Sequence, residues 1–180
     1  MRLNQPINSV ERTADDHGYW LAASDGGIFS FGDAKFYGSM GAHPYGHPIV
    51  GIRRTASGNG YWEYAGNGAV FPFGDAQSYG SLATTWLAAP VVSMQTTGTG
   101  HGYWLLTRDG HAYPFGDAVS SGDLGGCSNY GNAAGLLATP DGGGYWIATA
   151  NGAVIPFGDA ADLGFPTANG GPTVALLGAN

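Results

Sequence analysis

The sequence is poor in charged residues and cysteine and has no long hydrophobic run, and each shortage excludes a class of protein. Only 11% of the 180 residues are charged and six are basic. That is too few cations to neutralise a nucleic-acid backbone or to bind an anionic membrane surface. Cys127 is the single cysteine, so no disulfide forms within the chain. No apolar run approaches the roughly 20 residues of a membrane-spanning helix. We therefore expect neither nucleic acid nor a membrane as the partner.

The N-terminal residues lack the pattern of an export signal. Met1 to Pro6 contain no apolar segment and no signal cleavage site. We expect the chain to be made in the cytosol, unless it is a fragment from which a signal has been trimmed. The net charge of −7 makes an uncharged partner, either a glycan or another protein, the better match.

Glycine and aromatic residues, by contrast, are abundant and recur with a period of 42 residues. The chain has 33 glycines and is 13% aromatic. Gly-Tyr-Trp begins at Gly18, Gly60, Gly102 and Gly144. Phe-Gly-Asp-Ala begins at Phe31, Phe73, Phe115 and Phe157. A fixed internal period of this length is typical of propellers and solenoids.

The period divides one domain, residues 1–180, into four units and the beginning of a fifth. The units are approximately residues 6–47, 48–89, 90–131 and 132–171, and residues 172–180 repeat only the first strand. This spare strand either overlaps the other end of the chain to close a ring or pairs with a neighbouring chain, which would make a homo-oligomer. In the first unit the polar Asn8 stands where later units have an apolar residue, which is typical of an outer, capping strand.

Each unit contains signals for short antiparallel strands and tight turns. Asp-Gly or Asn-Gly occurs at one equivalent place in every unit, and these dipeptides favour a type I′ hairpin turn. They are Asp25-Gly26, Asn67-Gly68, Asp109-Gly110 and Asn151-Gly152. A fourth short element is expected at residues 36–40 and its equivalents. Prolines at 72, 114 and 156 interrupt the third strand, so we expect this strand to end early, to bulge at the proline or to lie near the sheet edge.

These features predict an all-β fold. Four-stranded antiparallel units of about 42 residues match the blades of a β-propeller, here with four blades. A β-solenoid or an open repeat array is the alternative. Successive tight hairpins favour the propeller, because a solenoid coil is not an antiparallel meander.

The motifs also resemble a known repeat. Residues 18–34, with Gly-Tyr-Trp, Asp-Gly-Gly and Phe-Gly-Asp-Ala in order, resemble a repeat of actinobacterial surface and secreted proteins and of proteins from phages that infect actinobacteria. The resemblance covers essentially the whole chain. It implies a binding role on a virion, in a tail or other exterior position, or on the cell envelope, and it implies no known reaction. A virion protein assembled in the host cytoplasm would need no export signal.

Residues that are identical in every unit are expected to hold the unit together rather than to bind a ligand. We expect the aromatic pairs to pack between blades and each aspartate to accept hydrogen bonds from a turn backbone. Alternatives are stacking on sugar rings for the aromatic residues and a ring of carboxylates around a cation for the aspartates. The residues are Tyr19, Trp20, Tyr61, Trp62, Tyr103, Trp104, Tyr145 and Trp146, with Asp33, Asp75, Asp117 and Asp159.

Binding specificity is expected where the units differ, in the loops at residues 41–47, 83–89, 125–131 and 165–171. A ring would display these loops together, and loops on a rigid scaffold often carry function. The candidate ligand-binding residues are His43, Tyr45, His47, Trp86, Asn129 and Tyr130. Two histidines without a third ligand are weak grounds for a metal site, so we expect neither metal nor cofactor.

The sequence predicts a non-enzymatic protein that binds actinobacterial cell-wall glycan. It contains no nucleophile elbow, zinc motif or phosphate loop, so no catalytic residue is assigned. One alternative is a structural or decoration protein whose partner is another virion protein or a second copy. The other is a glycan hydrolase, because Glu63 with a nearby aspartate would provide the two carboxylates that a glycosidase needs.

Overall fold

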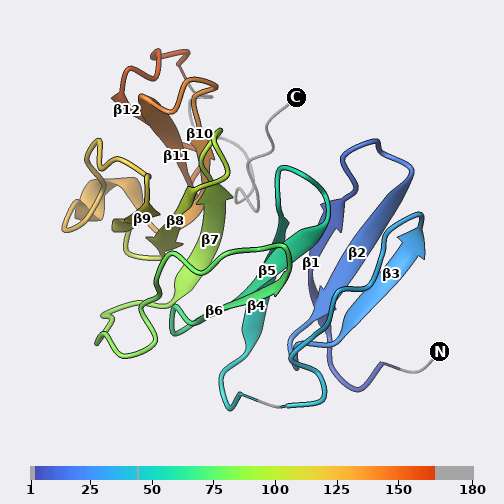
Figure 1. Cartoon of the computed structure of the whole chain (residues 1–180). Coiled ribbons are helices and arrows are strands. Elements are labelled where there is room, and N and C mark those ends of the chain that lie inside the picture. Colours follow the sequence, from blue (N-terminus) through green and yellow to red (C-terminus); the bar gives the residue numbers. More distant parts are fainter. Residues whose placement is uncertain (1–2, 44, 165–180) are drawn as a thin grey trace. The chain divides into compact units, whose positions relative to one another are not determined.

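We describe a computed structural model of the chain, covering residues 3–43 and 45–164. Within these residues it has twelve strands and one short 3₁₀ helix (Figure 1). The elements are β1 (Ile7–Arg12), β2 (Gly18–Ala23), β3 (Ile28–Gly32), β4 (Ile49–Arg54), β5 (Gly60–Ala65), β6 (Val70–Gly74), β7 (Val91–Thr96), β8 (Gly102–Thr107), β9 (Ala112–Gly116), η1 (Ser128–Tyr130), β10 (Ala133–Ala138), β11 (Gly144–Thr149) and β12 (Val154–Gly158). In the described part of the chain, no helix has the length and apolar character needed to cross a bilayer.

The strands form four three-stranded antiparallel sheets, one for each repeat (Figure 1). Their orders are β1-β2-β3, β4-β5-β6, β7-β8-β9 and β10-β11-β12. The expected fourth strand at residues 36–40 is wrong. That segment is irregular. The carbonyl oxygens of Lys35, just before it, and of Gly38, within it, accept hydrogen bonds from side chains, as described below. The spare first strand at residues 172–180 lies outside the described residues.

Each repeat has a hairpin at its Asp-Gly or Asn-Gly dipeptide, as predicted, but the expected type I′ turn is wrong. A type I′ turn needs positive φ at both central residues. Among the described residues Asp16 is the only non-glycine with positive φ, whereas Gly26 has φ of 85°. Gly26 N donates to Ala23 O, and Ala23 N donates to Gly27 O. This is the three-residue connection in which a glycine in the left-handed region closes the turn.

Two other sequence features are explained by the sheet edge. The third strand of every sheet is an edge strand, where a proline breaks no ladder on its outer side, so Pro72, Pro114 and Pro156 are tolerated. The glycine of Phe-Gly-Asp-Ala has φ of 66° or 67° in all four repeats, a conformation that favours glycine.

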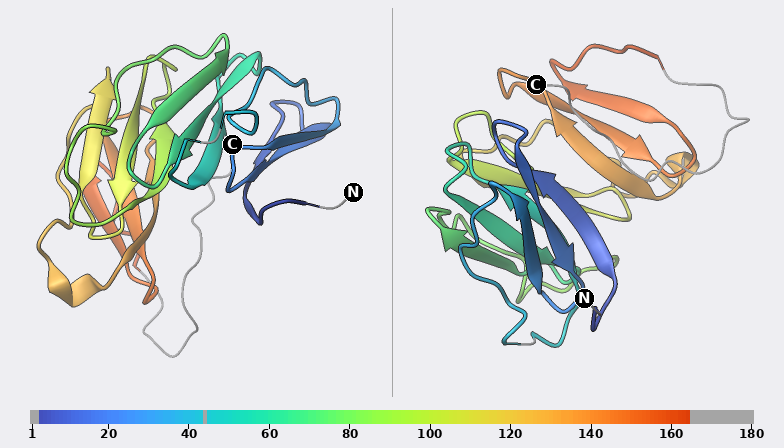
Figure 2. Two further views of the ribbon diagram at one scale, coloured as in Figure 1. Left: turned by 90° about the horizontal axis from the view of Figure 1, so that it is seen from below. Right: turned by 90° about the vertical axis from the view of Figure 1, so that its right-hand side faces the viewer.

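The chain divides into two compact units, Met1–Trp86 and Leu87–Asn180, each with two of the sheets (Figure 2). In the first unit, Trp20 and Ala22 of β2 pack against Ile52 and Tyr61 of the next sheet. In the second unit the core has the same plan and is formed by Trp104, Leu106, Ala112, Leu124, Ala133, Leu136, Tyr145 and Ile147. The core of each unit therefore lies between two sheets.

Candidate functional site

The side chains of the repeated tryptophans pack within the fold and donate hydrogen bonds to its backbone. Trp20, Trp62 and Trp104 are each 1% exposed, and Trp146 is half-buried. In every repeat the indole Nε1 donates to the carbonyl oxygen 15 residues later, over 2.7 to 2.8 Å. These acceptors are the carbonyl oxygens of Lys35, Gln77, Val119 and Ala161. The bond ties the second strand to the irregular segment after the third, so these indoles are not presented to a ligand.

The repeated tyrosines differ between the first repeat and the others. Tyr61, Tyr103 and Tyr145 have no exposed surface. The Tyr61 hydroxyl donates to Gly38 O at 2.6 Å, and burial raises the pKa of this phenol to about 12. Tyr145 donates in the same way to Gly122 O. Tyr19 is instead 42% exposed, and its ring stacks on Phe31 with the ring centroids 5.0 Å apart.

The repeated aspartates fasten the end of the third strand to the turn after the first. We expected backbone donors, but the partners are mainly hydroxyl groups. Asp75 accepts from Thr55 Oγ1 at 2.9 Å and from Ser57 Oγ at 2.5 Å. Asp117 accepts from Thr97 and Thr99, and the Thr99 hydroxyl holds the pKa of Asp117 below its usual value. Asp159 accepts from Thr139 at 3.2 Å.

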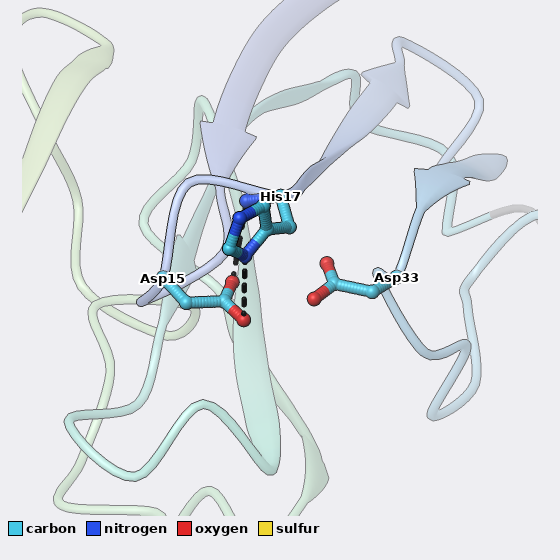
Figure 3. Close-up of side chains that lie close together, drawn as sticks. All are labelled: Asp15, His17 and Asp33. Carbon is cyan, nitrogen blue, oxygen red and sulfur yellow. Dashed lines mark hydrogen bonds and ion pairs between the residues drawn. The ribbon is translucent and has the colours of Figure 1, made fainter.

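The first repeat departs from this pattern, because Asp15 stands where the second and third repeats have Ser57 and Thr99; the fourth repeat also has an aspartate here, Asp141. Asp15 Oδ2 lies 3.2 Å from His17 Nδ1, and Asp33 turns its carboxylate toward both (Figure 3). The Thr13 hydroxyl and His17 lower the pKa of Asp15, and the hydrogen bond to Asp15 raises the pKa of His17.

Among the described residues, Asp15, His17 and Asp33 are the group with metal-ligand potential, because one donor atom from each lies within 4.8 Å of the others. All three side chains are exposed. A bound zinc or calcium ion takes four or more ligands, so water would have to complete the shell. The ion pair between Asp15 and His17 accounts for the close approach of those two side chains.

A shallow depression of about 250 Å³ lies beside the hairpin turn of the first repeat. Its lining includes Asp25 from this turn, Gln5 from the N-terminal segment, and Tyr45 and His47 from the first variable loop. Phe71 packs edge-on against the Tyr45 ring at 4.8 Å, and the Tyr45 hydroxyl accepts a hydrogen bond from Asn67 Nδ2 at 3.2 Å. The depression therefore combines an anchored aromatic ring with carboxylate and amide groups.

Glu63 is buried near this depression, at a position where the other repeats have Leu21, Leu105 and Ile147. Its side chain has no exposed surface. Oε1 accepts from Met40 N at 3.2 Å, and Oε2 is buried without a hydrogen-bond partner. Burial, with a smaller contribution from the charge of Asp25, raises the pKa of Glu63 to about 8. Asp25 is thus the aspartate near Glu63 that the sequence left unidentified.

The remaining loop candidates do not join the depression. His43 is exposed, and Trp86 is 86% exposed at the end of the first unit. Asn129 and Tyr130 lie in η1 of the second unit, and Tyr130 is 37% exposed. The fourth loop lies outside the described residues. The structure thus brings together Tyr45 and His47, whose ring centroids are 5.7 Å apart.

Comparison with known proteins informs the fold. No protein-family model matches the chain, and no curated protein matches it. Among solved structures, the β-propeller domain of Cps50 (Swd1) from Myceliophteria thermophila is similar, with a TM-score of 0.57 and 11% identity. The match covers 92% of this chain and 58% of that chain. The protein has a β-propeller fold. Its four sheets are therefore blades, numbered first to fourth along the chain, and the likeness concerns the fold alone.

Sequence reasoning does not identify Asp15 as a candidate functional residue of this propeller, and it identifies Glu63 only for the alternative of a glycan hydrolase, although the sequence holds a signal for both. Aligning the repeats puts the acidic Glu63 at an otherwise aliphatic position, and it puts Asp15 where two other blades have a hydroxyl residue. Asp25 was noticed only as a turn residue, and its place beside Tyr45 and His47 depends on contacts between two blades.

Proposed function

We propose that this propeller is a non-enzymatic carbohydrate-binding module whose variable loops contact cell-wall glycan. The observation that carries the proposal is the exposure of Trp86. This side chain lies in a loop that differs between blades and is 86% exposed, whereas the three fully packed repeat tryptophans are 1% exposed. A flat exposed indole offers an apolar face on which a sugar ring can stack, and tryptophan is enriched at binding surfaces.

The depression beside the first hairpin turn, which does not include Trp86, offers polar groups for a second contact with a glycan. Asn67 Nδ2 already donates to the Tyr45 hydroxyl oxygen, so the phenolic proton is left to donate to a sugar hydroxyl. Asp25 and Gln5, which also line the depression, supply a carboxylate and an amide. A neutral glycan satisfies these groups without the basic residues that an acidic ligand would require.

Binding is better supported than hydrolysis by the position of Glu63. A glycosidase needs two carboxyl groups that both reach the scissile bond. Glu63 has no exposed surface, so its carboxyl group is not accessible to a polymeric substrate in this structure. Asp25 alone lines the depression.

For the setting of this activity, the support is the resemblance of residues 18–34 to repeats of actinobacterial surface proteins and of actinobacteriophage proteins. We propose a position on the outside of a phage virion, such as the tail, or on the cell envelope. The ligand would then be actinobacterial cell-wall glycan.

Co-sedimentation with isolated actinobacterial cell walls tests the proposal, with sacculi from an unrelated bacterium as the control. We expect selective pelleting of the wild-type protein, loss of most pelleting for Trp86→Ala, and partial retention for Trp86→Phe, which keeps an aromatic ring. Val119→Ala is the matched variant, because Val119 is 61% exposed outside the variable loops. Equal pelleting of Trp86→Ala and the wild-type protein would contradict a role for this loop.

A further inference from the structure

One face of the first blade is exposed, although the same face is buried in every other blade. Within each repeat, one position in the first strand and one in the second lie on this face. Ile52, Met94 and Leu136 are at most 2% exposed, but their equivalent Val10 is 63% exposed. Tyr61, Tyr103 and Tyr145 are 0% exposed, but Tyr19 is 42% exposed. Phe31, which pairs with Tyr19 in the sheet, is also 42% exposed. We call Val10, Tyr19 and Phe31 the tyrosine face.

The repeat itself shows what covers a tyrosine face. In the first unit, the Tyr61 ring lies 5.7 Å from the indole of Trp20 on the preceding blade, at an interplanar angle of 60°. In the second unit, Trp104 and Tyr145 have the same distance and angle. The phenolic hydroxyl also donates to a carbonyl oxygen that follows the third strand of the preceding blade. The partner of a tyrosine face is therefore the opposite, tryptophan-bearing face of another blade.

Among the described residues, one tryptophan-bearing face is less buried than the others, on the fourth blade. Trp146 is half-buried, whereas its three equivalents are 1% exposed. Val154 pairs with Ala148 across the β11–β12 hairpin, which places it on the same face as Trp146. It is half-buried, as are its equivalents Ile28 and Val70. Gly164, the equivalent of Gly38 and Gly122, is exposed. We call Trp146 and Val154 the tryptophan face.

We propose that the tyrosine face of one copy is covered by the tryptophan face of a second copy, so that the chains associate head to tail. The two faces are the two halves of an interface that this chain already forms within each unit. Because they are different surfaces, the contact is heterologous, and it extends into a larger ring or a filament unless the rotation closes. The association is independent of the glycan proposed above.

The terminal strand of the tyrosine face is adapted to an outer position. β1 alternates between half-buried and exposed residues. β4, β7 and β10 each have three buried and three half-buried residues and no exposed one. Asn8, the polar residue of this strand, donates from Nδ2 to Ile49 O of the second blade at 2.8 Å. Asn8 thus binds the blade on the other side, and the tyrosine face remains accessible to a partner.

Analytical ultracentrifugation from micromolar to millimolar concentration tests the proposal. We expect the wild-type protein to associate as concentration rises and Val10→Asp to remain monomeric, because the new carboxylate would be buried without a partner. Val119→Asp is the control: Val119 is 61% exposed, close to the 63% of Val10, and lies outside both faces. It should associate like the wild-type protein.

Mixing variants tests the head-to-tail arrangement. Val154→Asp blocks the tryptophan face and should be monomeric alone, yet an equal mixture with Val10→Asp should form dimers and nothing larger, because one intact half remains on each copy. Circular dichroism checks that both variants fold, and the comparison of Val10→Asp with Val119→Asp stands even where Val154→Asp does not fold. A wild-type monomer at every concentration, or association of Val10→Asp equal to that of the wild type, would overturn the proposal. Wall co-sedimentation of Val10→Asp distinguishes this failure from failure of glycan binding.

Discussion

The ring of Tyr64 occupies the space where a side chain at Gly51 would begin. A Cβ atom added to Gly51 would lie 2.1 Å from the Tyr64 Oη atom and 2.2 Å from Cζ. The two residues are partners across β4 and β5, and Tyr64 is 7% exposed. The equivalent pair is Ser9 with Ala22 in the first blade and Ser93 with Leu106 in the third. The first strand has a small residue at this position in each of these pairs, and in the second and third blades its partner is large.

This relationship predicts a compensating pair of substitutions. Gly51→Ser should lower the free energy of unfolding by about 1–3 kcal/mol, because the buried tyrosine ring must move. Adding Tyr64→Leu, which copies the pair found in the third blade, should recover much of the loss. Urea unfolding of the two single variants and the double variant gives the coupling energy. Additive effects of the two substitutions would show that the contact is not the cause.

The raised pKa of Glu63 predicts that the free energy of unfolding falls as pH rises. Its pKa is about 8 in the folded protein against an ordinary value of 4.5, so the folded state binds the proton more tightly than the unfolded state. The contribution of the protonated Glu63 carboxyl group to the free energy of unfolding is fully present below about pH 4.5. It falls by about 1.4 kcal/mol per pH unit up to about pH 8 and is then lost. Glu63→Gln should remove this slope. Glu63→Leu should also remove it and should raise stability, because leucine stands at the equivalent positions 21 and 105.

Urea unfolding between pH 4.5 and pH 9 measures the effect of Glu63 as the difference between the wild-type and Glu63→Gln profiles. Asp25→Asn is the second variant: removing its charge should lower the pKa of Glu63 and end the decline at a lower pH. Parallel profiles of the wild-type protein and Glu63→Gln would be the contrary result.

His17 should titrate above the ordinary histidine value because of its bond to Asp15. The pKa of His17 is raised mainly by the hydrogen bond from its ring to Asp15. Asp15→Asn should therefore lower the pKa of His17, which an NMR titration of the imidazole protons would record. Asp141→Asn, the equivalent substitution in the fourth blade, should leave it unchanged. Because His17 and Asp15 are exposed, added salt should also weaken the shift. A His17 titration unaffected by Asp15→Asn would contradict the pairing.

The sequence was sufficient for the repeat, its hairpins and the propeller fold, because those follow from a fixed spacing of turn and aromatic residues. It was not sufficient for the turn type, since Asp-Gly supports both a type I′ turn and a connection in which only glycine has positive φ. The expected fourth strand failed for a different reason. The backbone at Lys35 and Gly38 is occupied by bonds from Trp20 and Tyr61, and these long-range contacts leave no local signal.

The candidate site was predictable in part. That Tyr45 and His47 are candidates in the first loop follows from their variation between repeats, whereas their burial does not. Their grouping with Asp25 could not be predicted, because it depends on how the first two blades pack. The exposure of the tyrosine face was also not predictable from the sequence. Tyr19 lies in the same Gly-Tyr-Trp motif as its buried equivalents and differs from them in lacking a covering blade among the described residues.

The bond from each repeat indole ends on a main-chain oxygen, so this bond does not depend on the side chain at the acceptor position. Lysine, glutamine, valine and alanine occupy that position at residues 35, 77, 119 and 161. The protein thus has four equivalent positions at which an indole holds the backbone and the residue type varies. Each is suited to a grafted label, charge or peptide, introduced one blade at a time.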